Sequence, residues 1–150
     1  MQIREATTSD DELVAGMRVR FLADHRGADG LPAPVVGATA SFVAERAASG
    51  LLLSWLAEEE GTCIGVVSLV LHDVPPHPEH RGDREGFVIN MYVDPAHRGS
   101  GVGRALLHAL HERASTLGLR RLTLHATAAG RPMYERLGFA TDDTWMQLPL

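Results

Sequence analysis

The segment VDPAHRGSGVGRALLHAL, residues 93–110, constrains the fold more than any other part of the chain. A strand-like run ends at Asp94-Pro95, glycines follow at alternate positions 99, 101 and 103, and an apolar helical pattern begins at once. Glycine lets backbone N–H groups approach a ligand. The first turn of a helix leaves N–H donors unpaired and carries the positive end of the helix dipole. The segment therefore predicts an anion site, most often for phosphate, to which Arg98 and Arg104 can add charge-assisted contacts.

Two common phosphate-binding motifs do not fit this segment. A dinucleotide fingerprint needs G-x-G-x-x-G/A, and its third position falls on Arg104 or Leu106, depending on which glycine starts the motif. The next predicted strand also ends in His125, where a ribose-binding acid is expected. A Walker A loop needs lysine, whereas all 14 basic residues of the chain are arginine. The sequence thus predicts a phosphate loop of another kind.

The first quarter of the chain predicts a strand and a helix. Residues 2–7 have the pattern of a short strand. Ser9 and Glu12 match an S-x-x-E capping box, which predicts that a helix begins there. Four-residue spacing gives this helix an apolar stripe of Leu13, Met17 and Phe21.

The middle of the chain predicts a loop, a helix and three strands. The Gly- and Pro-rich residues 26–38 predict the loop, and the second helix is expected at 41–49, ending at Gly50. Strands are expected at 51–60 and 63–71, joined by a hairpin turn at Gly61 and Thr62. The proline-rich residues 72–86 predict a loop, and residues 87–95 predict the third of these strands.

The last third predicts two helices and two strands around the glycine segment. The helix after the glycines buries a stripe of Val102, Leu106, Leu110 and Leu117 and ends at Gly118. A strand follows at 121–126, Pro132 begins a short helix that ends at Gly138, and TWMQLPL predicts a last strand. Without a repeat or linker, we expect one α/β domain over residues 1–150.

Composition excludes several classes of function. The net charge of −5 argues against a nucleic-acid partner, and no apolar run approaches the ~18–20 residues of a membrane span. The N-terminus MQIREATTSDDE has no apolar signal core, so a cytoplasmic location is expected. Cys63 is expected to be a packed small hydrophobe. His72, His77 and His80 lie in the proline-rich loop, and His108 and His111 are three positions apart on a predicted helix. Neither set comes with cysteine or carboxylates in a metal-site pattern, so no metal is expected.

The excess of negative over positive charge lies entirely in the first 60 residues. Residues 1–60 hold 5 Arg and 10 Asp and Glu, a net charge of −5, whereas residues 61–150 hold 9 of each. Two interpretations stay open: a solvated helix surface, or a cleft that attracts cations.

Two motifs resemble those of a known family. Arg98-x-x-Gly101-x-Gly103 matches R/Q-x-x-G-x-G/A, and Met133-Tyr134-Glu135-Arg136-Leu137-Gly138-Phe139, one helix and one strand later, matches Y-x-x-x-G-F. Both signatures are typical of the GNAT superfamily of acyl-CoA-dependent N-acyltransferases, which the chain resembles over nearly its whole length. The resemblance implies an α/β (α+β) fold with a mixed, mostly antiparallel central sheet flanked by about four helices. Its fourth and fifth strands would be splayed, with acetyl-CoA in the gap.

The resemblance also implies roles for particular residues. The fourth strand would pair its backbone with pantetheine at Met91, Tyr92 and Val93, and an N–H near Met91 would hold the oxyanion of the thioester carbonyl. Tyr134 would protonate the leaving thiolate. Thr127 stands where the family often has an asparagine that touches the cofactor, and its hydroxyl would replace part of that contact. The diphosphate would lie on the loop made by Arg98, Gly99, Ser100, Gly101, Val102, Gly103 and Arg104.

The general base stays open. Some members of the family carry a glutamate or histidine on the fourth strand at the positions of Phe87 or Ile89, and neither of these can take a proton. Glu85, two residues earlier, and His125 are the candidates, and an ordered water is the alternative. Asn90 cannot act as a base, but an asparagine inside an apolar strand is suited to hydrogen-bond the acceptor or the acyl carbonyl.

These observations predict an N-acetyltransferase that moves an acetyl group from acetyl-CoA to a primary amine by direct attack in a ternary complex. The acidic first 60 residues favour a small cationic amine as the acceptor. A protein or peptide N-acetyltransferase is one alternative, and a non-catalytic CoA-binding sensor is another. A homodimer is a further expectation that the resemblance leaves open.

Overall fold

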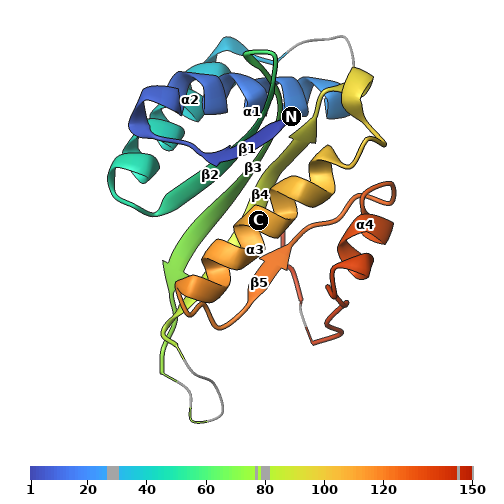
Figure 1. Ribbon diagram of the computed structural model, residues 1–150. Helices are drawn as coiled ribbons and strands as arrows, with labels where there is room; N and C mark the ends of the chain where they lie inside the picture. The colour runs from blue at the N-terminus through green and yellow to red at the C-terminus, as the bar shows by residue number, and fades with distance from the viewer. Residues whose placement is uncertain (27–30, 77, 79–81, 145, 150) are drawn as a thin grey trace.

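The computed structural model describes residues 1–26, 31–76, 78, 82–144 and 146–149. Within these residues, five strands form one sheet in the order β1-β2-β3-β4-β5 (Figure 1). Neighbouring strands are antiparallel except β4 and β5, which are parallel, so the predicted mixed and mostly antiparallel sheet is confirmed. The strands are β1 (Gln2–Glu5), β2 (Leu52–Glu59), β3 (Thr62–Asp73), β4 (Arg84–Val93) and β5 (Leu122–Leu124).

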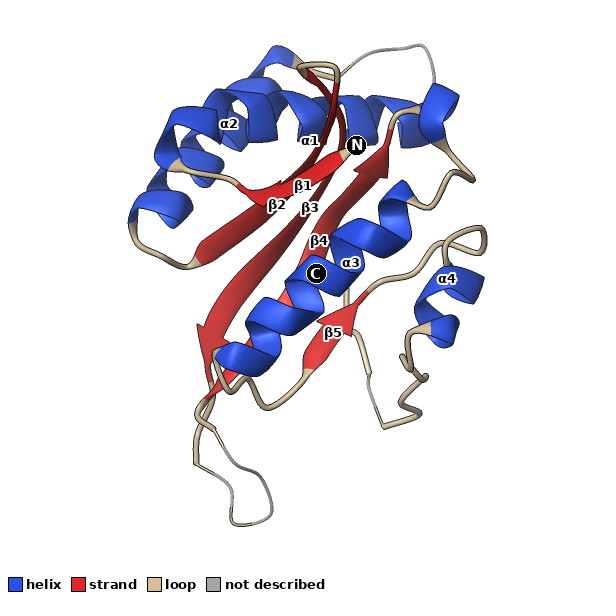
Figure 2. Cartoon of the chain, in the orientation of Figure 1, coloured by secondary structure: helices blue, strands red, loops and turns tan. Residues whose placement is uncertain are grey.

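Helices cover both faces of the sheet (Figure 2). α1 (Asp11–Arg26) and α2 (Ala33–Ala48) lie on one face, where Met17 and Val43 pack with Val66 of β3. α3 (Val102–Thr116) lies on the other face, where Leu106 packs with Val67. α4 (Arg131–Arg136) follows β5 at the edge of the sheet. None of the helices in the described residues has the length and hydrophobicity needed to cross a membrane.

A β-bulge interrupts β4 where the sequence has Asn90. Ser68 pairs with Ile89 and Val66 pairs with Tyr92, so Asn90 and Met91 both lie opposite Val67. The extra residue shifts the alternation of side chains by one position. Val88, Met91 and Val93 therefore pack on the α3 side, and Ile89 and Tyr92 pack on the α1 side.

The sheet opens beyond this bulge, between β4 and β5. The two strands pair at only three positions, the last of them Val88 with Leu124, while β4 continues to Val93. Gly86 makes the close pairing possible, because an added Cβ would lie 2.6 Å from Leu69 Cδ1 and 2.7 Å from Leu122 Cδ2. The predicted splay of the fourth and fifth strands is confirmed.

Several element boundaries differ from the sequence prediction. The predicted loop at 26–38 contains the first turns of α2, because Pro32 and Pro34 flank a helix start, where a missing N–H breaks no helical bond. The capping box uses Thr7 and Asp10 in place of Ser9 and Glu12, since a 3-10 turn at Thr8–Asp10 precedes α1.

Other differences concern burial and the ends of strands. Leu13 is 38% exposed, so the buried stripe of α1 runs through Val14 and Met17. The hairpin turn lies at Glu60 and Gly61, whose φ angles of 49° and 75° fit a type I′ turn. The loop predicted at 72–86 is shorter, because β3 extends to Asp73 and β4 begins at Arg84. The last strand, predicted over TWMQLPL, is wrong for the described residues 144 and 146–149, which are not in a strand.

Candidate functional site

The end of β4, the first turn of α3 and α4 converge on one small residue, Gly103. An added Cβ at Gly103 would lie 3.0 Å from Met91 Cε and 3.1 Å from Met133 Sδ. The glycine therefore lets α3 start close to the bulge of β4 and to α4. Met91 and Gly103, which the sequence assigns to one site, therefore lie beside α4, the helix that carries Tyr134.

The loop between β4 and α3 presents open backbone. Pro95–His97 forms a 3-10 turn that begins at Asp94, whose side chain accepts a hydrogen bond from the Ala96 N–H at 3.0 Å. Gly99 and Gly101 have φ angles of 81° and 92°, a region that favours glycine. A Cβ added at either would meet nothing within 4 Å. The N–H groups of the first turn of α3 thus border open space.

Arg98 has a different side-chain role from the charge-assisted phosphate contact that the sequence suggests. Its Nε donates to Val93 O at 3.0 Å, and its guanidinium donates to Asp24 Oδ2 at 2.5 Å. The same group lies 5.8 Å from the centre of the Tyr92 ring. Arg98 therefore ties the predicted phosphate loop to β4 and to α1.

A surface groove of about 940 Å³ runs along α3 on the side of β1. Ser100, Gly101 and Arg104 line the end of the groove nearest the phosphate loop, and Trp55 and Ile3 contribute apolar lining. Most of this groove lies away from the opening between β4 and β5. The groove therefore reaches this loop from the β1 side of α3.

Tyr134 lies on α4 and is 8% exposed. Its ring packs edge-on against Phe139 with centroids 5.8 Å apart. Burial raises the pKa of the Tyr134 phenol above its usual value of 10.0. The group is therefore protonated at neutral pH, as a proton donor must be.

Thr127 uses its hydroxyl within the turn that begins α4. Thr127 Oγ1 accepts a hydrogen bond from the Gly130 N–H at 3.1 Å, and Thr127 O accepts one from Arg131 N–H at 2.9 Å. The residue thus holds the start of the short helix that carries Tyr134. Its hydroxyl hydrogen is not used in the hydrogen bonds of the described residues.

Asn90 combines two unfavourable features. Its φ of 56° is left-handed, a region that asparagine tolerates better than most residues. It is 4% exposed, and its Oδ1 has no hydrogen-bond partner among the described residues. An unsatisfied buried acceptor costs about 1–3 kcal/mol. Such costs concentrate at functional sites.

Glu85 lies at the beginning of β4 and is 3% exposed. It accepts a hydrogen bond from Arg120 Nε at 2.7 Å, and its other oxygen lies 3.0 Å from Arg121 Nε and 3.7 Å from His72 Nε2. Asn90 is about 16 Å further along the strand, at ~3.3 Å per residue. Burial alone would raise the pKa of Glu85, but hydrogen bonds from Arg121 and Arg120 lower it overall. A carboxylate held in this way fastens β5 to β4, and the geometry does not favour it as the general base.

Replacing Glu85 with glutamine is expected to destabilise the fold by about 3 kcal/mol, because it leaves the charge of Arg120, whose side chain is 16% exposed, without its buried partner. The melting temperature should fall by about 6–12 °C. Since the folded-state pKa of Glu85 is lowered, its contribution is complete above the unfolded value of about 4.3 and is lost as the pH falls further. Melting curves of both proteins between pH 3 and 7 should therefore converge at the acid end.

The matched control is Glu135→Gln. Glu135 pairs with Arg131 at 3.9 Å, but its side chain is 58% exposed, so the change should cost less than about 1 kcal/mol. Equal melting temperatures for Glu85→Gln and Glu135→Gln at pH 7 would contradict the structural role of Glu85.

His125 immediately follows β5 and is exposed. Its ring packs edge-on against Phe87, with centroids 5.5 Å apart and an interplanar angle of 80°. This contact holds the imidazole where β5 leaves β4. Of the two side chains predicted as general base, His125 is the one beside the opening.

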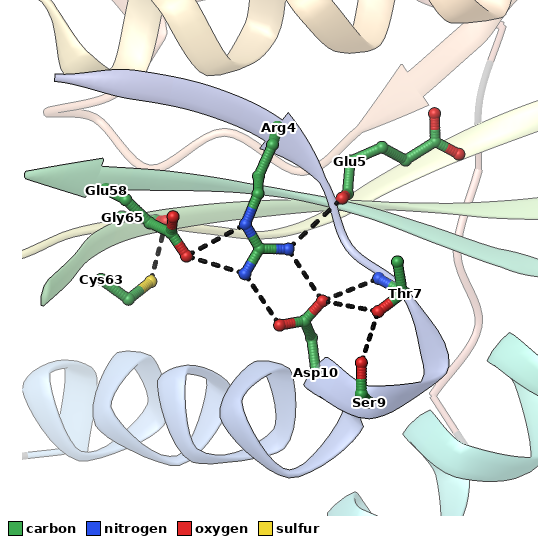
Figure 3. A network of polar contacts seen from close by, with 8 residues as sticks. All are labelled: Arg4, Glu5, Thr7, Ser9, Asp10, Glu58, Cys63 and Gly65. Atoms are coloured by element: carbon green, nitrogen blue, oxygen red, sulfur yellow. Dashed lines mark hydrogen bonds and ion pairs between the residues drawn. The ribbon is translucent and has the colours of Figure 1, made fainter. Parts of the chain in front are cut away.

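Of the nine acidic residues that the structure describes within positions 1–60, five form ion pairs: Glu5, Asp10, Asp24, Glu58 and Glu59. Arg4 donates to both oxygens of Asp10 at 2.8 Å and to Glu58 at 2.7 Å (Figure 3). These hydrogen bonds hold the pKa of Asp10 well below its usual range. Glu59 lies 3.6 Å from the N-terminal ammonium, and Asp24 pairs with Arg98. In the described residues, this pairing gives no support to a cleft that attracts cations.

Two contacts of the site could not be predicted from the sequence. Asp24 and Arg98 are 74 positions apart, and Glu85 and Arg120 are 35 apart, so no local pattern links either pair. The only signal for Glu85 is a charged residue beside an apolar strand. In the described residues, no three His, Cys, Asp or Glu side chains gather as metal ligands.

Known acetyltransferases resemble this chain in sequence and in fold. The sequence model of the acetyltransferase (GNAT) family matches residues 32–139. A predicted acetyltransferase from Clostridium acetobutylicum, solved with acetyl-CoA, has a TM-score of 0.88 and 28% identity, and the match covers 99% of this chain and 95% of that one.

Two curated relatives have named substrates or products. A glucosamine 6-phosphate N-acetyltransferase from Trypanosoma brucei brucei is 32% identical over 90 residues, which are 60% of this chain and 59% of that protein. A mycothiol acetyltransferase from Amycolatopsis mediterranei is 38% identical over 96 residues, which are 62% of this chain and 32% of that protein. The chain therefore spans less than two thirds of the length of these relatives.

Proposed function

The chain belongs to the acetyltransferase (GNAT) family, and we propose that it transfers the acetyl group of acetyl-CoA to a primary amine. One observation carries the proposal: the open turn at Gly99 and Gly101 lies at the start of α3, beside the opening between β4 and β5. A diphosphate needs such a set of free N–H donors at a helix N-terminus. A thioester arm needs an unpaired strand edge, which β4 offers beyond Val88.

The residues present fit acetyl-CoA, which supplies an activated acetyl thioester when bound. The backbone of Arg98–Arg104 would hold the diphosphate, and the backbone of Met91–Val93 would pair with the pantetheine amides. The Met91 N–H would donate to the thioester oxygen, since the bulge at Asn90 and Met91 removes this part of β4 from regular pairing.

The proposed reaction is direct. The amine nitrogen bonds to the carbonyl carbon, the C–S bond breaks, and Tyr134 donates its proton to the leaving sulfur. A covalent cysteine intermediate is not needed. Burial raises the pKa of the Cys63 thiol, which opposes formation of a nucleophilic thiolate.

The amine must lose a proton before or during attack. An alkyl amine has a pKa of about 10.4, so it arrives mostly as an ammonium ion. We assign the first proton, lost from the ammonium, to His125 or to an ordered water, because Glu85 is committed to Arg120 and Arg121. The nitrogen loses a second proton as the amide forms, and this proton restores the phenol of Tyr134.

We propose a small molecule that is cationic at neutral pH as the acceptor. The trypanosome relative, by its name, acetylates the amine of an amino sugar phosphate, which is a small molecule. The support is the chemistry of the amine and not a cluster of free carboxylates, given the ion pairs of Asp10, Glu58 and Asp24.

A thiol-release assay with acetyl-CoA and a panel of acceptors tests this proposal. The panel holds amino sugars, amino sugar phosphates, polyamines, aminoglycosides and peptides with free N-termini. Release above the acceptor-free rate is expected with at least one free small amine. Release with peptides alone would show a protein-directed enzyme, and binding without release on any acceptor would show a non-catalytic CoA sensor. Either result would contradict the proposal.

A further inference from the structure

We infer that Asn90 Oδ1 binds one N–H of the acceptor amine and thereby selects primary amines over their N-methyl derivatives. The inference rests on the proposed function and adds a specificity-determining residue to it. It starts from the bulge in β4, where Asn90 is held with a left-handed φ of 56°.

The position of Asn90 places it at the reacting atoms. It comes immediately before Met91, whose N–H would bind the thioester oxygen, and consecutive Cα atoms are only about 3.8 Å apart. It also lies two residues beyond Val88, the last residue of β4 that pairs with β5. The residue therefore sits where the sheet opens, beside the expected thioester.

The chemistry of the unpaired Asn90 Oδ1 restricts the groups that can bind to it. Asn90 is 4% exposed, and its Oδ1 is buried without a partner among the described residues. An amide oxygen accepts hydrogen bonds and cannot donate them. The acetyl group has no N–H or O–H, so it cannot satisfy this atom. The acceptor amine can, because its nitrogen must come to the carbonyl carbon.

A neutral amide also suits the reaction better than a carboxylate would. A carboxylate beside the amine would favour the ammonium form, which cannot attack. An amide oxygen orients the nitrogen through one N–H without that charge. A neutral primary amine has two N–H bonds: one is held by Asn90 and the other is lost as a proton. An N-methyl amine has only one N–H bond, so it cannot both keep a hydrogen bond to Asn90 and lose a proton.

The experiment compares an accepted primary amine with its N-methyl derivative in three proteins: wild type, Asn90→Gly and Asn90→Asp. Glycine keeps the left-handed bulge without the oxygen, and aspartate keeps both an oxygen and tolerance of this conformation. The readouts are thiol release, for kcat and KM of each amine, and calorimetry, for the Kd of acetyl-CoA.

For wild type, kcat/KM should be at least about tenfold higher for the primary amine. In Asn90→Gly, kcat/KM for the primary amine should fall about 10- to 100-fold, and the preference over the N-methyl amine should disappear. The Kd of acetyl-CoA should stay within about twofold. In Asn90→Asp, the KM of the primary amine should return to within about fivefold of wild type.

Three results would overturn the inference. Equal kcat/KM for both amines in wild type would do so without any variant. A preserved preference in a folded Asn90→Gly protein would show that Asn90 only shapes the bulge. A large rise in the Kd of acetyl-CoA in that variant would place Oδ1 against a pantetheine amide. In each of these cases, thiol release by wild type with a primary amine would still support the proposed acetyltransferase function. If wild type released no thiol with any amine, both the proposed function and the inference about Asn90 would be wrong.

Discussion

Replacing Gly101 with valine is expected to weaken acetyl-CoA binding at least about 100-fold. Gly101 caps the N-terminus of α3 with a φ of 92°, and a side chain there would project into open space beside the free N–H groups. Hydrogen bonds from such groups to a charged oxygen are worth about 1.5–3 kcal/mol each, so losing two of them gives this factor. Calorimetric titration with acetyl-CoA measures the effect.

The matched control for this change is Gly118→Val. Gly118 lies just past the other end of α3, has a φ of 66°, and likewise has no atom within 4 Å of an added Cβ. Both valines carry the strain of a left-handed backbone, but only Gly101→Val should lose acetyl-CoA. If Gly101→Val does not fold, Gly101→Ala replaces it, with a weaker loss expected. Normal affinity in a folded Gly101 variant would contradict the phosphate loop.

Replacing Tyr134 with phenylalanine is expected to lower kcat about 100-fold or more. The change removes one hydroxyl and leaves the packing of the ring against Phe139 in place. General acids contribute about 10²–10⁴-fold to rate. The Kd of acetyl-CoA should stay within about twofold, because the proton is needed only as the thiolate leaves. Steady-state thiol release and calorimetry separate the two quantities.

The pH dependence of wild type provides a second readout. A general acid works only while protonated, and burial raises the pKa of Tyr134 above 10.0. The decline in kcat due to loss of this proton should therefore begin above pH 10, and Tyr134→Phe should lack it. An unchanged kcat in Tyr134→Phe would remove Tyr134 as the acid.

The sequence predicted the local structure of residues 99–110 well, because its signal there is local. Gly99 and Gly101 have positive φ angles, and Val102, Leu106 and Leu110 are buried as predicted, whereas Leu117 of the same stripe is only half-buried. The splay of β4 and β5 is a feature that the resemblance to the GNAT superfamily implied. Asn90 was singled out because asparagine is unusual inside an apolar strand.

The sequence did not predict the features that depend on contacts between residues far apart in the chain. Glu85 looks like a loop carboxylate until Arg120 and Arg121 are brought against it by the pairing of β4 and β5. Pro32 and Pro34 read as loop residues, although the first turn of α2 accommodates them. The predicted C-terminal strand contains apolar residues, but Met146 and Leu148 are 91% and 82% exposed, so burial does not stabilise a strand at these described positions.

The most direct test of the account is a calorimetric titration of the purified chain with acetyl-CoA. The account predicts micromolar affinity with about one acetyl-CoA per chain. It also predicts that Gly118→Val retains this binding and Gly101→Val loses it. No binding by a chain shown to be folded would mean that the Arg98–Arg104 loop does not hold CoA, and this result would contradict the central claim.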